Sequence, residues 1–242
     1  MITGKIEEQI LYEDRDILVC HKPAGIAIQS AGIGTMDLES MLKNYLALKN
    51  GEVSRQTPGK QVYLAVIHRL DQPVEGVIVF GKTPRAAKEL SSQIAGGKME
   101  KVYLAVTFGT PPARDGILED YLKKDGKTNT SFVTGANVPG SKKAKLSYRV
   151  LEGVPDDLEG KDKYLIRIQL ETGRHHQIRV QMAHGGMPLC GDRKYGVPGK
   201  ANPGLGLCSA ELSFIHPSSG KKMKFKTVPK GSAFQGFSLN KH

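Results

Sequence analysis

Two short apolar runs with a polar loop between them form the centre of this chain. The first run covers 64–67 (LAVI) and the second covers 77–80 (VIVF). Pro73 and Gly76 lie between them, and short apolar runs bounded by such residues are typical of buried strands. Asp71 is therefore predicted to lie on a loop between two core strands, which is a common position for a catalytic group. Arg69 places a cation two residues before it.

The rest of the chain contains many strand patterns and few helical ones. Helical spacing of apolar residues occurs at 36–48 and 84–97, and the polar segment at 50–61 is predicted to be a loop. Strand patterns separated by Gly, Asp, Asn and Pro turns occur at 8–23, 98–107, 116–122, 127–133, 142–151, 163–170, 207–215 and 223–228. This succession predicts an α+β fold with a mixed, mainly antiparallel sheet and a few flanking helices.

The start of the second helix has two competing interpretations. Thr83 is predicted to be its N-cap, with Pro84 as the first helical residue. However, 76–83 also fits the phosphate-loop pattern G-x-x-x-x-G-K-[ST], which would make the protein a nucleotide-binding ATPase. A phosphate loop needs a flexible turn, whereas the four residues between these glycines are apolar and suit a core strand, so the strand interpretation is favoured. For the first helix, Thr35 and Asp37 are the candidate caps.

Composition limits the classes of partner and compartment. The 242 residues carry a net charge of +11, which favours a polyanionic partner, nucleic acid first, although many soluble proteins are basic without such a partner. The length suits one domain with its own core. We find neither a transmembrane run nor a basic-then-apolar leader, so we expect a cytoplasmic protein without membrane partners. The three cysteines, at 20, 190 and 208, lack C-x-x-C spacing and are predicted to be core residues.

A second polar segment, ETGRHHQIRVQMAHGG at 171–186, combines a cluster of cations with a helical pattern. A strand is predicted to end at Gly173, and a helix to run from about 174 to a glycine stop at 185. His176 and Arg179 are three residues apart and are expected to share one face of that helix. Cations near a helix start oppose the helix dipole, an arrangement suited to a site that meets an anion.

The histidines of this segment offer a metal-binding alternative. His175, His176 and His184 could supply imidazole ligands. They lack the H-E-x-x-H arrangement that places two histidines one turn apart with an acidic base. We therefore expect no metal at this segment.

Three motifs together resemble the RNA pseudouridine synthases of the RluA type. They are HRLD at 68–71, KVYLAVTFG at 101–109 and GRHHQIR at 173–179, the last followed by PLCGDRKYG at 188–196. Their order and spacing match the family, and the similarity extends from about residue 8 to residue 229. It includes a Lys-Pro-x-Gly turn at 22–25. The family's central motif continues with Thr-Ser-Gly, whereas this chain has Val74-Glu75-Gly76.

The resemblance implies a function and a fold. It implies one pseudouridine synthase catalytic domain over 1–242, without a separate N-terminal RNA-binding module. The expected activity is isomerisation of selected uridines in ribosomal or transfer RNA to pseudouridine. That reaction replaces a C–N glycosidic bond by a C–C bond and requires no cofactor. We expect a monomer with RNA as its partner and no obligate protein partner.

The resemblance also implies roles for particular residues. Asp71 matches the nucleophile, Tyr103 matches the tyrosine that lies against the target base, and Arg179 matches the arginine that pairs with the nucleophile. The resemblance further implies RNA-facing or loop-supporting positions for His68, Arg69, Arg174 and His176. Arg69 would fill the gap that a flipped base leaves.

Two further alternatives remain at this point. Replacement of Thr-Ser by Val74-Glu75 is compatible with an RNA-binding paralogue that has lost activity. A glycosidase-like hydrolase would need a second acid near Asp71. Glu75 is the only local candidate, and we expect it to face water.

Overall fold

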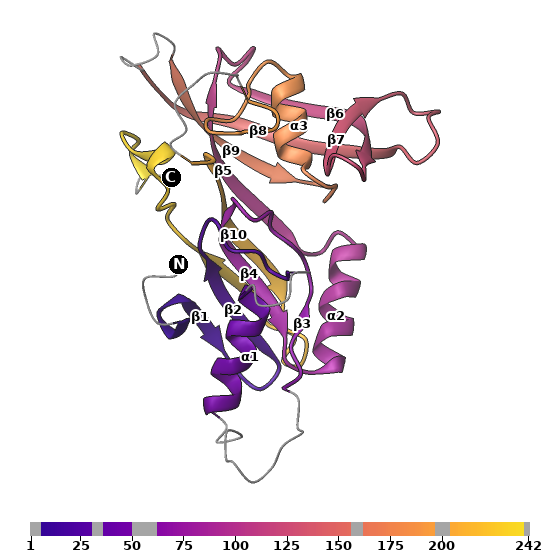
Figure 1. Cartoon of the computed structure of the whole chain (residues 1–242), viewed down its shortest axis with the longest axis vertical. Coiled ribbons are helices and arrows are strands. Elements are labelled where there is room, and N and C mark those ends of the chain that lie inside the picture. Colours follow the sequence, from indigo (N-terminus) through magenta and orange to yellow (C-terminus); the bar gives the residue numbers. More distant parts are fainter. Residues whose placement is uncertain (1–5, 31–35, 50–61, 156–161, 197–203, 240–242) are drawn as a thin grey trace. The chain divides into compact units, whose positions relative to one another are not determined.

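The computed structural model describes residues 6–30, 36–49, 62–155, 162–196 and 204–239 (Figure 1). Contacts between residues divide the chain into two compact units. The first unit comprises Met1–Met99 and Leu212–Thr227, and the second comprises Glu100–Glu211 and Val228–His242. The loop predicted at 50–61 and the candidate cap Thr35 lie outside the described residues.

The first unit contains a sheet with strand order β1-β2-β4-β10, with β3 paired to β4 and β11 paired to β10. Its elements are η1 (Ile6–Gln9), β1 (Ile10–Glu13), β2 (Ile17–Lys22), α1 (Leu38–Lys49), β3 (Ala65–Val66), β4 (Glu75–Gly81), α2 (Pro84–Ala95) and β11 (Lys222–Lys226). Strand β10 (Leu207–Ile215) begins in the second unit and ends in the first. β2 runs antiparallel to both β1 and β4.

The core of the first unit lies between the sheet and α2. One face of the sheet contributes Ile17, Val19, Val77, Val79, Leu212 and Phe214, and α2 contributes Ala86 and Leu90. Every residue of β4 is buried, which excludes a flexible phosphate loop at 76–83. Thr83 caps α2 as predicted, because its side chain accepts the Ala86 N–H at 3.2 Å. Asp37 caps α1 by accepting the Ser40 N–H at 2.8 Å.

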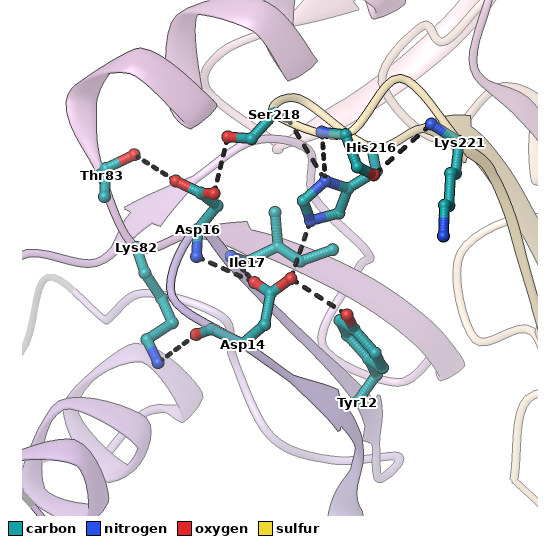
Figure 2. A network of polar contacts seen from close by, with 10 residues as sticks. Tyr12, Asp14, Asp16, Ile17, Lys82, Thr83, His216, Ser218 and Lys221 are labelled. Carbon is teal, nitrogen blue, oxygen red and sulfur yellow. Dashed lines mark hydrogen bonds and ion pairs between the residues drawn. The ribbon is translucent and has the colours of Figure 1, made fainter.

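The turn between β1 and β2 is fixed by the carboxylate of Asp14 (Figure 2). Asp14 accepts hydrogen bonds from the Tyr12 hydroxyl at 3.0 Å and from the Ile17 N–H at 2.9 Å. Its Oδ2 lies 2.8 Å from Nε2 of His216. Because Nδ1 of His216 accepts the Ser219 N–H at 3.1 Å, the imidazole proton is assigned to Nε2, which donates to Asp14. The carboxylate thereby ties β1 and β2 to the turn that follows β10.

We expect Asp14→Ala to destabilise the protein by about 2–3 kcal/mol, because several donors would lose their charged acceptor. Urea denaturation at pH 7 measures the change in unfolding free energy. Asp115→Ala is the matched control: Asp115 pairs with Arg149 on the exposed surface, so its loss should cost less than about 1 kcal/mol. Equal effects of the two substitutions would contradict the role given to Asp14.

The pH dependence of the same variant follows from the direction of the Asp14 shift. Burial acts to raise the pKa of Asp14, but hydrogen bonds from Ile17, Asp16, Tyr12 and His216 lower it overall. The carboxylate therefore contributes stability above its ordinary pKa, and this contribution is lost as the pH falls through the lower folded-state pKa. The stability difference between wild type and Asp14→Ala should shrink in acid.

The second unit is built on a sheet with strand order β10-β5-β9-β8-β6-β7. Its further elements are β5 (Glu100–Phe108), β6 (Asp115–Asp125), β7 (Thr130–Thr134), β8 (Lys142–Val154), β9 (Lys163–Leu170), α3 (Gln177–His184) and η2 (Ser232–Phe234). α3 lies against β6 and β7 (Figure 1). Val180 of α3 packs against Leu122 and Ala144. The predicted α+β fold with a mainly antiparallel sheet is confirmed. All three cysteines are buried in the core, as predicted.

α3 begins three residues later than the sequence pattern predicts. Residues 174–176 form a turn, and His176 is the N-cap with a left-handed φ of 52°. The side chain of Gln177 stabilises that turn by accepting the Arg174 N–H at 2.9 Å. The prediction that His176 and Arg179 share a helix face is therefore wrong, because His176 precedes the helix. Among the described helices, none combines the length and apolar character needed to cross a membrane.

Candidate active site

The loop between β3 and β4 carries Asp71 in a tight turn. The Val74 N–H donates to the Asp71 carbonyl at 3.0 Å, which closes a four-residue turn around Gln72 and Pro73. Leu70 and Val74 on either side are only 6% and 2% exposed, so they anchor the loop in the core, whereas Asp71 is half-buried. The carboxylate thus stands on a short loop with both ends held.

A buried lysine ties this loop to the turn after β2. Lys22, the last residue of β2, is fully buried, and its Nζ donates to the Gln72 carbonyl at 3.0 Å. The same ammonium donates to the carbonyls of Pro23 at 3.0 Å and Ile26 at 2.8 Å. The Gly25 N–H donates to the Gln72 carbonyl at 2.8 Å. The Lys-Pro-x-Gly turn therefore fixes the backbone beside Asp71.

The environment of Lys22 makes its charge costly. Burial lowers the pKa of Lys22 to about 8, and the negative charges of Asp71 and Glu75 partly oppose that shift. The hydrogen-bonding partners of its ammonium are three neutral carbonyls. The sequence pattern of this segment predicts only a turn. A lysine that ends a continuous apolar strand (ILVCHK) was the signal that could have identified it.

We expect the stability of the wild type to rise with pH between about 8 and 10.5. The folded-state pKa of Lys22 is about 8 and its ordinary value is 10.5, so the unfolded chain binds more protons in this window. The gain should reach up to about 3 kcal/mol relative to Lys22→Met, which lacks the titrating group. Unfolding of both proteins in urea from pH 7 to pH 10.5 measures it. Parallel curves for the two proteins would show that Lys22 is not charged and buried as described.

The two other predicted residues of the HRLD motif point in different directions. His68 is 9% exposed, and its Nε2 accepts the Val79 N–H from β4 at 3.3 Å. Arg69 is exposed, and its guanidinium donates to Oε1 of Gln29 at 3.0 Å. His68 therefore supports the loop from inside, whereas Arg69 lies at the surface.

Glu75 does not face water as expected. It is 4% exposed, and its carboxylate lies 3.7 Å from Nε2 of His21 on β2. The reason is that β4 begins at Glu75 and is buried along its whole length. A carboxylate held in this way beside a neighbouring strand is a structural group of the first unit, which weakens the hydrolase alternative.

In the second unit, Arg179 is held by a carboxylate that sequence analysis did not single out. Its Nε and Nη2 donate to the two oxygens of Asp192 at 2.8 and 2.7 Å. Arg179 is 5% exposed and the Asp192 side chain is fully buried. Burial acts to raise the pKa of Asp192, but the hydrogen bonds and charge of Arg179 lower it overall. The pair is therefore an ionised, two-point salt bridge.

Tyr195 brings His176 and Arg179 together. Its hydroxyl lies 2.7 Å from Nδ1 of His176 and accepts the Ser131 N–H at 2.7 Å. The Arg179 guanidinium carbon lies 5.2 Å from the centre of the Tyr195 ring, a cation–π contact. His175 stacks on His176 at 3.8 Å between ring centres. A shared aromatic partner, rather than a shared helix face, connects these two predicted residues.

The remaining predicted residues occupy separate places in the second unit. Tyr103 lies on β5 opposite Ile168 of β9 and is 6% exposed. Arg174 is exposed, and its Nε donates to the Lys143 carbonyl at 2.8 Å. Asp71 belongs to the first unit, whereas Tyr103 and Arg179 belong to the second. The pairing of Asp71 with Arg179 stays a prediction.

Lysines of the basic cluster at 142–145 are paired with acidic residues of the second unit. In the basic cluster at 142–145, Lys143 pairs with Glu119 at 2.7 Å and Lys145 pairs with Glu171 at 2.9 Å. This pairing favours a solvated charged surface over a dedicated phosphate site.

The described residues include no group of three or more His, Cys, Asp or Glu side chains placed to hold a metal ion.

The sequence of this chain is similar to those of several known proteins. The pattern of the family described as RNA pseudouridylate synthase matches residues 16–184. An uncharacterized RNA pseudouridine synthase of Bacillus subtilis, YlyB, is 33% identical over 93% of this chain and 70% of its own length. A similar uncharacterized synthase of Synechocystis, slr1629, is 31% identical over 91% of this chain and 65% of its own length. The ribosomal large subunit pseudouridine synthase D of Zymomonas mobilis is 31% identical over 90% and 68%, respectively. The chain thus spans about two thirds of the length of these relatives.

Solved structures share the fold. The human RNA pseudouridylate synthase domain containing 1 superposes with a TM-score of 0.73 at 22% identity, covering 95% of this chain and 86% of that chain. The human RNA pseudouridylate synthase domain containing 4 gives 0.72 at 19% identity, covering 93% and 90%. At these identities the likeness concerns the fold alone.

Proposed function

Because the chain belongs to the RNA pseudouridylate synthase family, we propose that it isomerises specific uridines in ribosomal or transfer RNA to pseudouridine. The C–N bond between uracil and ribose breaks, the base turns, and a C–C bond forms at the same ribose carbon. Asp71 is the nucleophile in this proposal, which makes the reaction a case of covalent catalysis by a carboxylate. The observation that carries it is the HRLD motif, whose aspartate stands on a loop locked by Lys22.

Arg179 and Tyr103 complete the proposed catalytic set. Arg179 is proposed to pair with the nucleophile, as the arginine of the matching motif does in the family. Tyr103 supplies a rigid aromatic side chain on β5 that bounds the uracil. Both roles rest on the match of their motifs with the family and on the local burial of each side chain.

RNA binding is assigned to exposed cations. A uridine within structured RNA must be flipped out at a cost of a few kcal/mol, and contacts with phosphates offset that cost. Arg69 and Arg174 are exposed and lie in the two loops that carry the first and third motifs. The buried rings of His68 and His176 support those loops from inside. The net charge of +11 adds a general attraction for phosphates.

The chain organisation proposed here is one catalytic domain that includes both compact units. The family match runs from residue 16 to residue 184 and therefore covers parts of both. We propose that the protein acts as a cytoplasmic monomer with RNA as its partner. The isomerisation involves no net oxidation or reduction, and we propose that it uses no metal or other cofactor.

Release of tritium from RNA labelled at C5 of uridine tests the proposed activity directly. Formation of the new C–C bond at C5 displaces the hydrogen there, so an active enzyme releases label into water in proportion to pseudouridine formed. We expect multiple turnovers on ribosomal or transfer RNA transcripts. Binding of these RNAs without any release of label would favour the inactive paralogue that Val74-Glu75 suggested.

A further inference from the structure

The loop at 188–196 carries an aspartate and a tyrosine that the proposed function leaves without a role. Asp192 binds Arg179 through both carboxylate oxygens, and its side chain is fully buried. A buried charge pair costs desolvation energy and is weak evidence for a purely stabilising role. The two-point geometry instead fixes the plane of the guanidinium.

The loop itself is built to hold Asp192 still. Its beginning is bonded to β5, since the Phe108 N–H donates to the Pro188 carbonyl at 2.9 Å and the Cys190 N–H donates to the Val106 carbonyl at 2.8 Å. Its end closes on itself, because the Gly196 N–H donates to the Asp192 carbonyl at 2.9 Å. A side chain at Gly196 would collide with that carbonyl.

The Asp192 carboxylate is also oriented by its own loop. Its Oδ1 accepts the backbone N–H groups of Lys194 at 2.9 Å and Tyr195 at 3.2 Å. The backbone of the loop therefore holds the Asp192 carboxylate in place independently of Arg179. This is the arrangement expected of a preorganised support rather than of an adaptable surface ion pair.

Tyr195 holds the guanidinium from a second direction. Its ring lies under the guanidinium of Arg179, and its hydroxyl is fixed by the Ser131 N–H and by His176. The backbone of His176 is in the left-handed region, which costs energy for a residue other than glycine. The contact with Tyr195 helps to maintain this strained turn at the start of α3.

We propose that Asp192 and Tyr195 are positioning residues that fix the orientation of the Arg179 guanidinium for its part in the reaction. Asp192 holds two of its N–H groups, and the Tyr195 ring lies against its face. Preorganised donors accelerate a reaction because they need not reorient when charge develops. This inference rests on the proposed catalytic role of Arg179.

The first test compares two Asp→Asn variants in the tritium-release assay. Asp192→Asn is expected to lower kcat by about 10- to 100-fold while KM for RNA stays within about twofold, because a misplaced group costs rate rather than binding. Asp115→Asn is the matched control, since it breaks an exposed pair with Arg149 in the same unit, and its kcat should remain that of wild type. Unchanged kcat in folded Asp192→Asn would overturn the proposal.

A double variant shows whether Asp192 acts through Arg179. If it does, adding Asp192→Asn to Arg179→Ala should lower kcat no further than Arg179→Ala alone. Independent, multiplicative losses would contradict the proposal. Arg179→Lys serves if Asp192→Asn does not fold, because it keeps the charge but not the planar fork. Near wild-type kcat in Arg179→Lys would overturn the inference.

A readout that does not depend on activity separates this inference from the proposed function. The Nε–H signal of Arg179 in ¹⁵N NMR, assigned by its loss in Arg179→Lys, should be protected from solvent exchange in the wild type. It should lose that protection in Asp192→Asn and keep it in Asp115→Asn. If the wild type releases no tritium, the proposed function fails, and this signal still decides whether Asp192 positions Arg179. Equal protection in wild type and Asp192→Asn would exclude that role.

Discussion

The Asp71→Asn variant is expected to form pseudouridine at least about a thousandfold more slowly than the wild type, because loss of the proposed nucleophile removes the proposed reaction path. The amide is almost isosteric with the carboxylate. The turn that carries it depends on backbone groups and on Lys22, so the loop should persist. Binding of RNA should stay within severalfold of the wild type. Tritium release under single-turnover conditions and a filter-binding titration measure the two quantities.

A turn aspartate elsewhere in the chain provides the control for this result. Asp125 also lies in a tight turn, where its carboxylate accepts the Lys127 N–H at 2.8 Å and the Thr128 hydroxyl at 2.8 Å. Asp125→Asn should leave turnover at the wild-type level. Normal turnover by Asp71→Asn on a confirmed RNA substrate would remove Asp71 from its role, whatever the control shows.

The Arg179→Ala variant is expected to lower the rate of pseudouridine formation by roughly 100-fold and RNA affinity by much less. It should also lose about 3–5 kcal/mol of stability, because it leaves the Asp192 carboxylate buried without its partner. Single-turnover rates, RNA titrations and urea denaturation measure the three effects. The rates and affinities should be measured at a temperature at which the variant is folded.

Two outcomes would change the interpretation of Arg179. Equal losses of rate and affinity would make it an RNA contact rather than a catalytic residue. Unchanged stability would show that the Asp192 carboxylate finds other compensation or becomes protonated. The double variant Arg179→Ala/Asp192→Asn separates the two possibilities. We expect it to recover part of the stability that Arg179→Ala loses, whereas a compensated or protonated Asp192 predicts no recovery.

The sequence was sufficient for the strand-rich architecture and for most element positions. Continuous apolar runs bounded by turn residues indicate β2 and β4, and helical spacing after a cap indicates α2, because burial and capping are local requirements. The cap Thr83 illustrates this. The start of α3 was predicted wrongly because helical spacing alone does not reveal the left-handed backbone of His176. That conformation is supported by Tyr195, nineteen residues further along the chain.

Local sequence patterns could not predict the supporting residues of the candidate site. Lys22 looks like the end of a strand, and its role follows only from the carbonyls of two loops that meet around its ammonium. Asp192 sits in a recognisable block, but its pairing with Arg179 follows from a fold-back between α3 and the loop after it. Glu75 was expected at the surface because it is charged, and the burial of β4 reverses that expectation.

Pseudouridine mapping of total RNA in cells that lack this protein, complemented with either wild type or Asp71→Asn, tests the central claim most directly. The account predicts that at least one pseudouridine in ribosomal or transfer RNA is absent without the protein. It should return with the wild type and remain a uridine with Asp71→Asn expressed at the same level. Restoration of the modification by both proteins, or an RNA map that never changes, would contradict the claim that Asp71 makes this chain an RNA-modifying isomerase.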